Sequence, residues 1–145
     1  MTMLTANEIR QNLGHFCFTQ EHHRVNPMFR MVCTDGVFWL LQNADAHWLF
    51  DAIASYQGTL RKNPQLKSFQ HWVLSVGGRD EKTEEISFPF LIPKKKNIGL
   101  LTCWWDTPVV GVKPSVKQVI GCTNFPLTEI RFFLEEGVLL LPREH

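Results

Sequence analysis

The sequence predicts an α+β fold, with residues 1–145 as a single compact domain. We expect a mainly antiparallel sheet of about five to seven strands with two helices packed on it. Three observations favour this class. Met31 to Gln57 follows the order strand, tight turn, strand, helix; Ile98 to Trp105 is a strand-like apolar run; and two apolar runs flank Glu135-Glu136-Gly137. A chain of this length buries roughly 70% of its unfolded surface, so it can form a core without disulfides.

The first predicted element is a short helix that begins after Thr5. Thr5 and Glu8 have the spacing of a capping box, in which each side chain accepts a hydrogen bond from the other residue's amide. An apolar stripe runs from Ile9 to Phe16, and Gly14 is expected to close the helix in a left-handed conformation.

A hairpin and a central helix are predicted next. Phe29 to Cys33 is the first strand, and Thr34-Asp35-Gly36 is the turn, because Asp-Gly between apolar runs favours a type I′ turn. The second strand, Val37 to Leu41, is apolar on both faces, so both faces need cover. The helix Ala44 to Tyr56, capped by Asn43 and stopped by Gly58, covers one face. A second layer or a partner subunit would cover the other.

The middle of the chain alternates strands with polar connections. Because Pro89 cannot donate a backbone hydrogen bond, we expect the run Ile86 to Ile92 to be an edge strand or an irregular segment. The other expected elements are a polar connection with one helical turn around Asn63-Pro64, a strand from Gln70 to Val76, an exposed loop over 77–85, a turn at Lys94 to Asn97, a strand from Ile98 to Trp105, a loop over 106–115 and a strand from Val116 to Cys122.

Two interpretations compete at the carboxyl end. Leu127, Ile130 and Leu134 fit a helical stripe, whereas Ile130, Phe132 and Leu134 fit strand alternation. The following run Val138 to Leu141 is too short for a helix and suits a strand. We therefore favour a hairpin that turns at Glu136-Gly137.

Composition and charge limit the classes of partner and compartment. Hydrophobic residues make up 44% of the chain, charged residues 20%, and the net charge is +1, which is typical of a globular protein without a polyanionic partner. We expect no signal peptide and no membrane span. The four cysteines are widely spaced, which favours buried free thiols over disulfides, a reducing compartment and hence the cytoplasm.

His47, Asp51 and Ser55 follow one face of the predicted central helix, because they are four residues apart. Their residue types suggest a hydrolase, but a catalytic triad needs the histidine between its two partners. We therefore interpret them as a polar stripe with a His47–Asp51 pair and predict no catalytic residue.

No pair of potential metal ligands has the spacing of a zinc site. The potential ligands are His15, Cys17, His22, His23, His71 and Cys103. His15, Cys17, His22 and His23 would form a site only if the fold brought them together. We predict no metal and no cofactor.

The aromatic residues are the stronger functional candidates. Trp104 and Trp105 are neighbours in a predicted strand, so they point to opposite faces. Together with Trp39 they form core, an oligomer interface or a ligand groove, and all three alternatives stay open. The residues expected at a ligand site or interface are Trp39, Trp104, Trp105, His22, His23 and Arg24.

Three hypotheses of function follow. The leading one is a non-catalytic binding protein that acts through an aromatic apolar surface, self-associates and contacts protein partners. The second is a small enzyme with a cleft lined by His, Asp and Cys residues. The third is weak nucleic-acid binding through Arg24 and the run Lys94 to Lys96, which the near-neutral charge disfavours.

Three segments resemble an uncharacterised family of small bacterial domains of unknown function. They are Leu4 to Ile9; Thr34 to Gly36 together with Trp48 to Ser55; and Phe125 to Ile130 together with Gly137 to Pro142. The match spans both ends and is poor over residues 60–122. The resemblance implies a single compact domain of bacterial or mobile-element origin, and it implies no activity.

Overall fold

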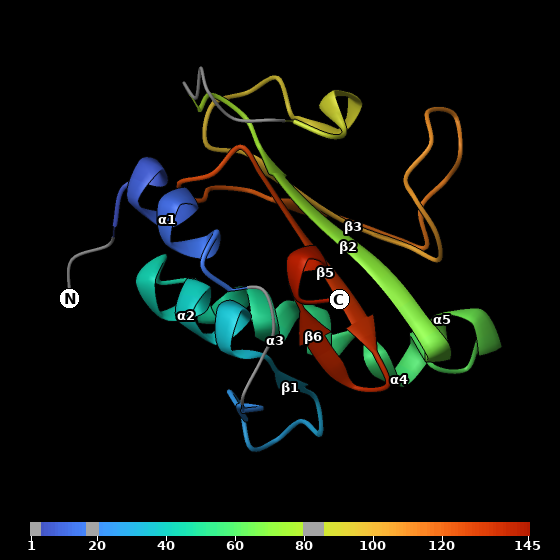
Figure 1. The fold of residues 1–145 in the computed structure, drawn as a ribbon. Coiled ribbons are helices and arrows are strands. Elements are labelled where there is room, and N and C mark those ends of the chain that lie inside the picture. Colours follow the sequence, from blue (N-terminus) through green and yellow to red (C-terminus); the bar gives the residue numbers. More distant parts are fainter. Residues whose placement is uncertain (1–3, 17–20, 80–85) are drawn as a thin grey trace. The chain divides into compact units, whose positions relative to one another are not determined.

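The computed structural model describes residues 4–16, 21–79 and 86–145, and it has an α+β fold as predicted (Figure 1). The described helices are α1 (Ala6–Leu13), α2 (Asp35–Asn43), α3 (His47–Ser55), α4 (Gln57–Leu60) and α5 (Pro64–Ser68), with 3₁₀ turns η1 (Pro89–Leu91) and η2 (Pro142–Glu144). The described strands are β1 (Val32–Cys33), β2 (Phe69–Val76), β3 (Gly99–Trp104), β4 (Val116–Ile120), β5 (Glu129–Glu135) and β6 (Val138–Leu140).

The strands form a mixed, mainly antiparallel sheet in the order β1-β6-β5-β2-β3-β4. β1 runs parallel to β6, whereas β2–β3, β3–β4 and β5–β6 are antiparallel pairs. The predicted class of sheet and its number of strands are therefore confirmed.

The chain divides into two compact units, and each is described by itself. The helical unit comprises Met1–Gln70 and Phe132–His145, and the sheet unit comprises His71–Arg131. The expectation of one domain stays a prediction.

The predicted hairpin at Thr34-Asp35-Gly36 is wrong, because these residues begin helix α2. Thr34 is the extended N-cap, and Val37 to Leu41 is helical rather than a strand. Val37, Leu40 and Leu41 are buried at a spacing of three and four residues, which places them on one helical face. A short apolar run without alternation fits a buried strand and a buried helix equally well. The expected first strand shortens accordingly to β1.

The predicted boundaries of the central helix also differ from those observed. α3 begins at His47, because Asn43 still belongs to α2 and Asp45, at φ 50°, makes the turn between the two helices. Gly58 does not stop the helical region, since it lies inside α4. Gly14 likewise has right-handed φ and ψ values, although the capping box of Thr5 and Glu8 is present as predicted.

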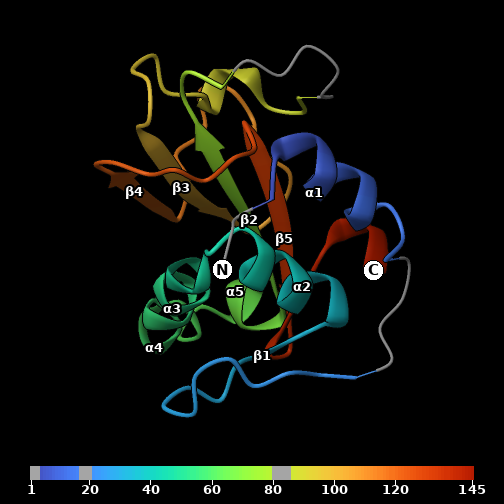
Figure 2. The ribbon, with the colours of Figure 1, turned by 90° about the vertical axis from the view of Figure 1, so that its left-hand side faces the viewer.

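The carboxyl-terminal end of the chain lies beside α2 (Figure 2). The carboxylate of Glu144, near that end, caps the amino end of α2. It accepts hydrogen bonds from Thr34 Oγ1 at 2.6 Å, the Gly36 amide at 3.2 Å and the Leu141 amide at 3.1 Å. The first amides of a helix have no partner within the helix, so this carboxylate supplies a cap that the Thr34 side chain does not. A negative charge at this end is also favoured by the helix dipole.

The predicted carboxyl-terminal hairpin is confirmed. β5 and β6 pair with Glu135 opposite Val138, and the turn between them has φ 49° at Glu136 and 83° at Gly137. Two successive residues with positive φ define a type I′ turn, which matches the twist of the strands.

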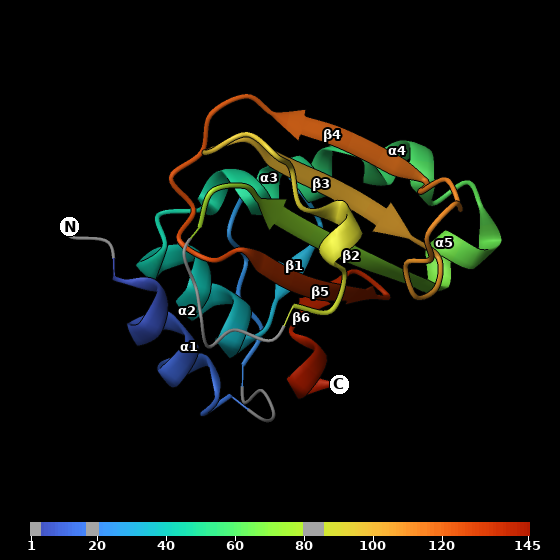
Figure 3. The ribbon, with the colours of Figure 1, turned by 90° about the horizontal axis from the view of Figure 1, so that it is seen from above.

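The sheet unit is built on β2, β3 and β4, which lie side by side (Figure 3). Val73, Phe88, Leu91 and Trp104 form a buried cluster on it. The segment Ile86 to Ile92 is irregular around η1. Of the two predicted alternatives, an edge strand and an irregular segment, the second is therefore confirmed.

Replacing Glu144 with Gln tests the cap. Glu144→Gln loses the negative charge at the helix end and weakens three hydrogen bonds, so we expect a destabilisation of about 1–2 kcal/mol. Urea unfolding at unchanged m-value measures it. Glu136→Gln, which removes an exposed carboxylate elsewhere in the same unit, is the control. Equal unfolding midpoints for the two variants would contradict the capping role.

A pair of glycines separates backbone conformation from packing. A Cβ atom at Gly137 or at Gly58 meets no atom within 4 Å, but only Gly137 has positive φ. Gly137→Ala should therefore destabilise the protein by about 1 kcal/mol, whereas Gly58→Ala in helix α4 should stabilise it by about 0.5–1 kcal/mol. Thermal unfolding of both variants measures the two opposite shifts, and shifts of the same sign would contradict the assignment.

Candidate functional site

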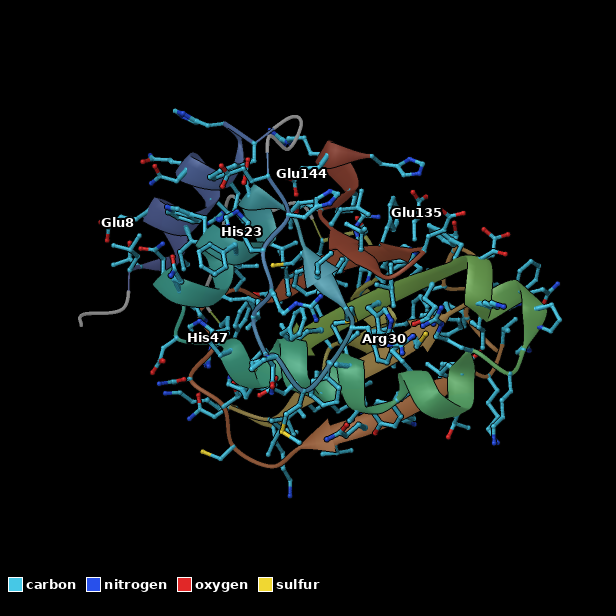
Figure 4. The ribbon with its side chains drawn as sticks, turned by 90° about the horizontal axis from the view of Figure 1, so that it is seen from below. Glu8, His23, Arg30, His47, Glu135 and Glu144 are labelled. Carbon is cyan, nitrogen blue, oxygen red and sulfur yellow. The ribbon has the colours of Figure 1, made fainter. Side chains whose placement is uncertain are left out.

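The helical unit contains a cavity of about 780 Å³. Four stretches of chain line it: residues 28–32 before and in β1, the end of α3 with α4, the region from Lys67 to Gln70, and the hairpin residues 134–138. Figure 4 looks onto the side of the chain that carries Arg30, one of the lining residues. The volume lies within the range of small-molecule sites in proteins.

Four of the residues that line the cavity are buried, three of them apolar, and we call this part of the lining the floor. Met31, Ala54 and Leu134 are its buried apolar residues, and Gln70 is buried beside them. Val32 and Val138, which are partners in the register of β1 and β6, add half-buried apolar wall. The parallel pairing of β1 and β6 thus brings two of the four stretches together.

The amides of Gln57 and Gln70 form a reciprocal pair at the cavity. Each Nε2 donates to the other residue's Oε1, at 2.9 Å and 2.7 Å. The second hydrogen of each amide goes to a backbone carbonyl, of Ile53 for Gln57 and of Leu66 for Gln70. All four amide hydrogens therefore bond within the protein, and the pair connects α3, α4 and α5.

The rim of the cavity is positively charged. Arg30, Arg61 and Lys67 are exposed there, and Glu136 is the one carboxylate among the lining residues. In the ranges that the structure describes, none of the three cations lies within ion-pair distance of a carboxylate. Three uncompensated cations at one cavity attract an anion.

Two predicted candidates support the stretch that leads into the cavity. Arg24 Nη1 donates to the Phe29 carbonyl at 2.8 Å, and Asn26 Nδ2 donates to Asp51 Oδ1 at 3.1 Å. Met28 is held by its amide, which donates to Asn26 Oδ1. Arg24 and Asp51 therefore act on the cavity through the backbone of residues 24–29.

His23 forms a pair with Asp35 at the start of α2. Its Nε2 lies 2.8 Å from Asp35 Oδ1, and its ring stacks on that of Phe38 with 4.2 Å between the ring centroids. Cys33 lies in β1 next to this helix start, but burial, with smaller contributions from Glu144 and Asp35, raises the pKa of its thiol to about 12. This thiol stays protonated at neutral pH and is not an activated nucleophile.

The structure does not bring together those potential metal ligands that it describes. His15 and His22 are exposed, Cys17 lies outside the described residues, and Cys33 and Cys103 are buried free thiols. Among residues 4–16, 21–79 and 86–145, no three His, Cys, Asp or Glu side chains form a cluster that could hold a metal ion.

The polar stripe of α3 does not act as one group. Asp51 is bonded to Asn26, and Ser55 Oγ donates to the Ala52 carbonyl at 2.6 Å. His47 is exposed at the first residue of the helix (Figure 4).

The tryptophans differ in their surroundings. Trp39 is half-buried on α2, with its ring 5.9 Å from that of Phe16. In the sheet unit Trp104 is 4% exposed and belongs to the core, whereas its neighbour Trp105 is 54% exposed. This difference in exposure agrees with the expectation that the two side chains point to opposite faces.

The cationic candidates for nucleic-acid binding belong to separate parts of the chain. Arg24 lies in the helical unit, and Lys94, Lys95 and Lys96 form an exposed bend and turn in the sheet unit. The backbone at Lys95 and Lys96 lies close against Gly77 and Gly78, where an added Cβ would meet atoms at 2.3–2.7 Å.

Sequence reasoning missed the lining residues of the cavity. The sequence places these residues in strands, loops or a helix end and indicates no ligand-binding role for them. They are Arg30, Gln57, Arg61, Lys67 and Gln70. They come from segments up to 40 residues apart. Arg61 and Lys67 share one polar stretch of the sequence, but Arg30 lies far from both.

These features define an α+β protein with a cation-rimmed cavity. The chain belongs to a family of unknown function, DUF6876, whose model matches residues 7–145. This confirms the expected membership in an uncharacterised family. No curated protein and no solved structure matches the chain. In the part of the chain that the structure describes, no helix is long and apolar enough to cross a membrane.

The buried His71 of β2 predicts a pH dependence of stability. Burial, with a smaller contribution from the charge of Arg131, lowers the pKa of His71 to about 4, and the charge of Asp106 opposes this shift. The unfolded ring titrates near 6.5, so unfolding takes up a proton between these two pH values. The stability from the neutral ring is complete above pH 6.5 and is lost as the pH falls towards 4, by at most about 3 kcal/mol.

Urea unfolding of the wild type and of His71→Gln at pH 7, 6 and 5 measures this loss. The difference in unfolding free energy between the two proteins should shrink as the pH falls. His47→Asn, at an exposed histidine, should keep the wild-type slope. A difference that stays constant with pH would contradict the assignment.

Proposed function

We propose that this protein is a non-catalytic binding protein whose ligand is a small organic anion held in the cavity of the helical unit. The observation that carries the proposal is the rim of Arg30, Arg61 and Lys67, three exposed cations without a carboxylate within ion-pair distance in the described chain. Such groups bind carboxylates and phosphates by charge-assisted hydrogen bonds.

The size and charge of the site favour a small molecule over a polyanion. The cavity of about 780 Å³ suits a small organic ligand. Glu136 interrupts the positive rim, and the whole chain has a net charge of only +1. A nucleic acid would need a longer basic track to release many counterions.

Binding without catalysis fits the chemistry of the neighbouring groups. The thiol of Cys33 is buried with a pKa raised to about 12, and the Nε2 of His23 is bonded to Asp35. Neither group is presented to the cavity as a lining residue. Self-association, a protein partner reached through Trp105 and a cytoplasmic location stay predictions.

Charge reversal at the rim tests the anion site. Titration calorimetry with sodium hexanoate, benzoate, phenyl phosphate and inorganic phosphate would identify an acid that binds. We expect Arg61→Glu and Lys67→Glu each to weaken its affinity at least about tenfold, because each removes a charge-assisted contact. Lys62→Glu changes an equally exposed cation by the same charge but lies outside the lining, so it should leave the affinity unchanged.

Failure of every anion in the panel to bind would overturn the proposed function. An equal loss of affinity in Lys62→Glu would also overturn it, because the effect would then come from net charge and not from the cavity.

A further inference from the structure

We infer that the ligand is an amphipathic acid: a single carboxylate or phosphate joined to an elongated apolar body such as an acyl chain. This inference rests on the proposed function, and it adds which part of the ligand lies where. The acid group contacts the cations of the rim, and the apolar body lies on the buried floor.

The first argument is the separation of charge from depth in the cavity. Its charged residues, Arg30, Arg61, Lys67 and Glu136, are all exposed. Its buried residues are Met31, Ala54, Leu134 and Gln70. A compact anion such as inorganic phosphate would use only the rim and leave the apolar floor without a partner. A ligand with an apolar body uses both.

The second argument is that the polar groups near the floor are already satisfied. The amide hydrogens of Gln57 and Gln70 donate to each other's oxygens and to the carbonyls of Ile53 and Leu66. The hydroxyl of Ser55, which is an exposed lining residue, also donates within the protein, to the Ala52 carbonyl. A polar group placed deep in the cavity would lose its hydrogen bonds to water without gaining these donors, which is costly. The deep part of the ligand is therefore apolar.

The third argument concerns the shape of the apolar body. Met31 is buried in the cavity, and Met28, which is 87% exposed, stands at its opening. Methionine side chains are flexible and polarizable, so they adapt to an apolar chain of variable length. A large exposed methionine beside a cavity also gains buried area when a ligand covers it.

A chain-length series tests this inference on the wild-type protein. Calorimetry with butanoate, hexanoate and octanoate, all as sodium salts below their micellar concentrations, should show an affinity that rises about threefold to fourfold per methylene. Octylamine and 1-octanol, which keep the chain but lack the anion, should bind at least about tenfold more weakly than octanoate.

Nuclear magnetic resonance locates the chain. With ¹³C-methyl methionine, octanoate should shift the Met31 methyl resonance at saturation, and butanoate should shift it much less. Ala54→Leu, which fills part of the floor, should reduce the affinity for octanoate more than the affinity for butanoate.

The outcomes separate the two proposals. An affinity that does not change with chain length, while Arg61→Glu still abolishes binding, would overturn the amphipathic ligand and leave the anion site standing. Equal binding of 1-octanol and octanoate would overturn the anion site itself. Absence of binding by all three acids would overturn the amphipathic ligand, and the phosphate and aromatic probes then decide the anion site separately.

Discussion

The helical unit depends on the contact between residues 32–36 and the carboxyl-terminal end of the chain. The amides of Val32 and Thr34 donate to the carbonyls of Gly137 and Leu139, which builds the parallel pair of β1 and β6. Beside this strand pair, Glu144 caps the start of α2 by accepting hydrogen bonds from Thr34 and Gly36. The contact closes a loop of about a hundred residues, whose entropic cost grows only slowly with length. Strand pairing and helix capping, acting on the same short segment, offset that cost together.

The cavity follows from this contact, because β1 and β6 supply two of its walls. Residues 28–32 enter β1 from one side, and the hairpin turn at Glu136 and Gly137 enters β6 from the other. The reciprocal amide pair of Gln57 and Gln70 fixes the remaining walls. The donors of the β1–β6 hydrogen bonds and of the amide pair are therefore used within the protein. The exposed cations at the rim are then the principal polar groups that can bind a ligand.

Two Gly-containing pairs, Asp35-Gly36 and Glu136-Gly137, show how far the local sequence determines whether a hairpin turn forms. Glu136-Gly137 makes the predicted hairpin, because both residues reach positive φ and the flanking strands alternate. Asp35-Gly36 gives a similar local signal but lies in the first turn of α2, where Glu144 accepts the Gly36 amide hydrogen. That acceptor is more than a hundred residues away, so no window around residue 36 contains it. The cavity was missed for the same reason, because only the tertiary fold brings Arg30 to Arg61 and Lys67.

The aromatic residues of the sequence predict an exposed apolar surface. Of the three candidate tryptophans only Trp105 is exposed, and the direction of each side chain in the fold explains why. Composition reports how much apolar area a chain carries, but the cover on each side of a strand decides how much stays exposed. Trp104 points towards the core formed with Val73 and Phe88, and Trp105, one residue on, points the other way. A site that depends on aromatic area alone would thus rest on Trp105. The cavity instead combines an apolar floor with uncompensated charge, and this combination selects a ligand by two independent properties.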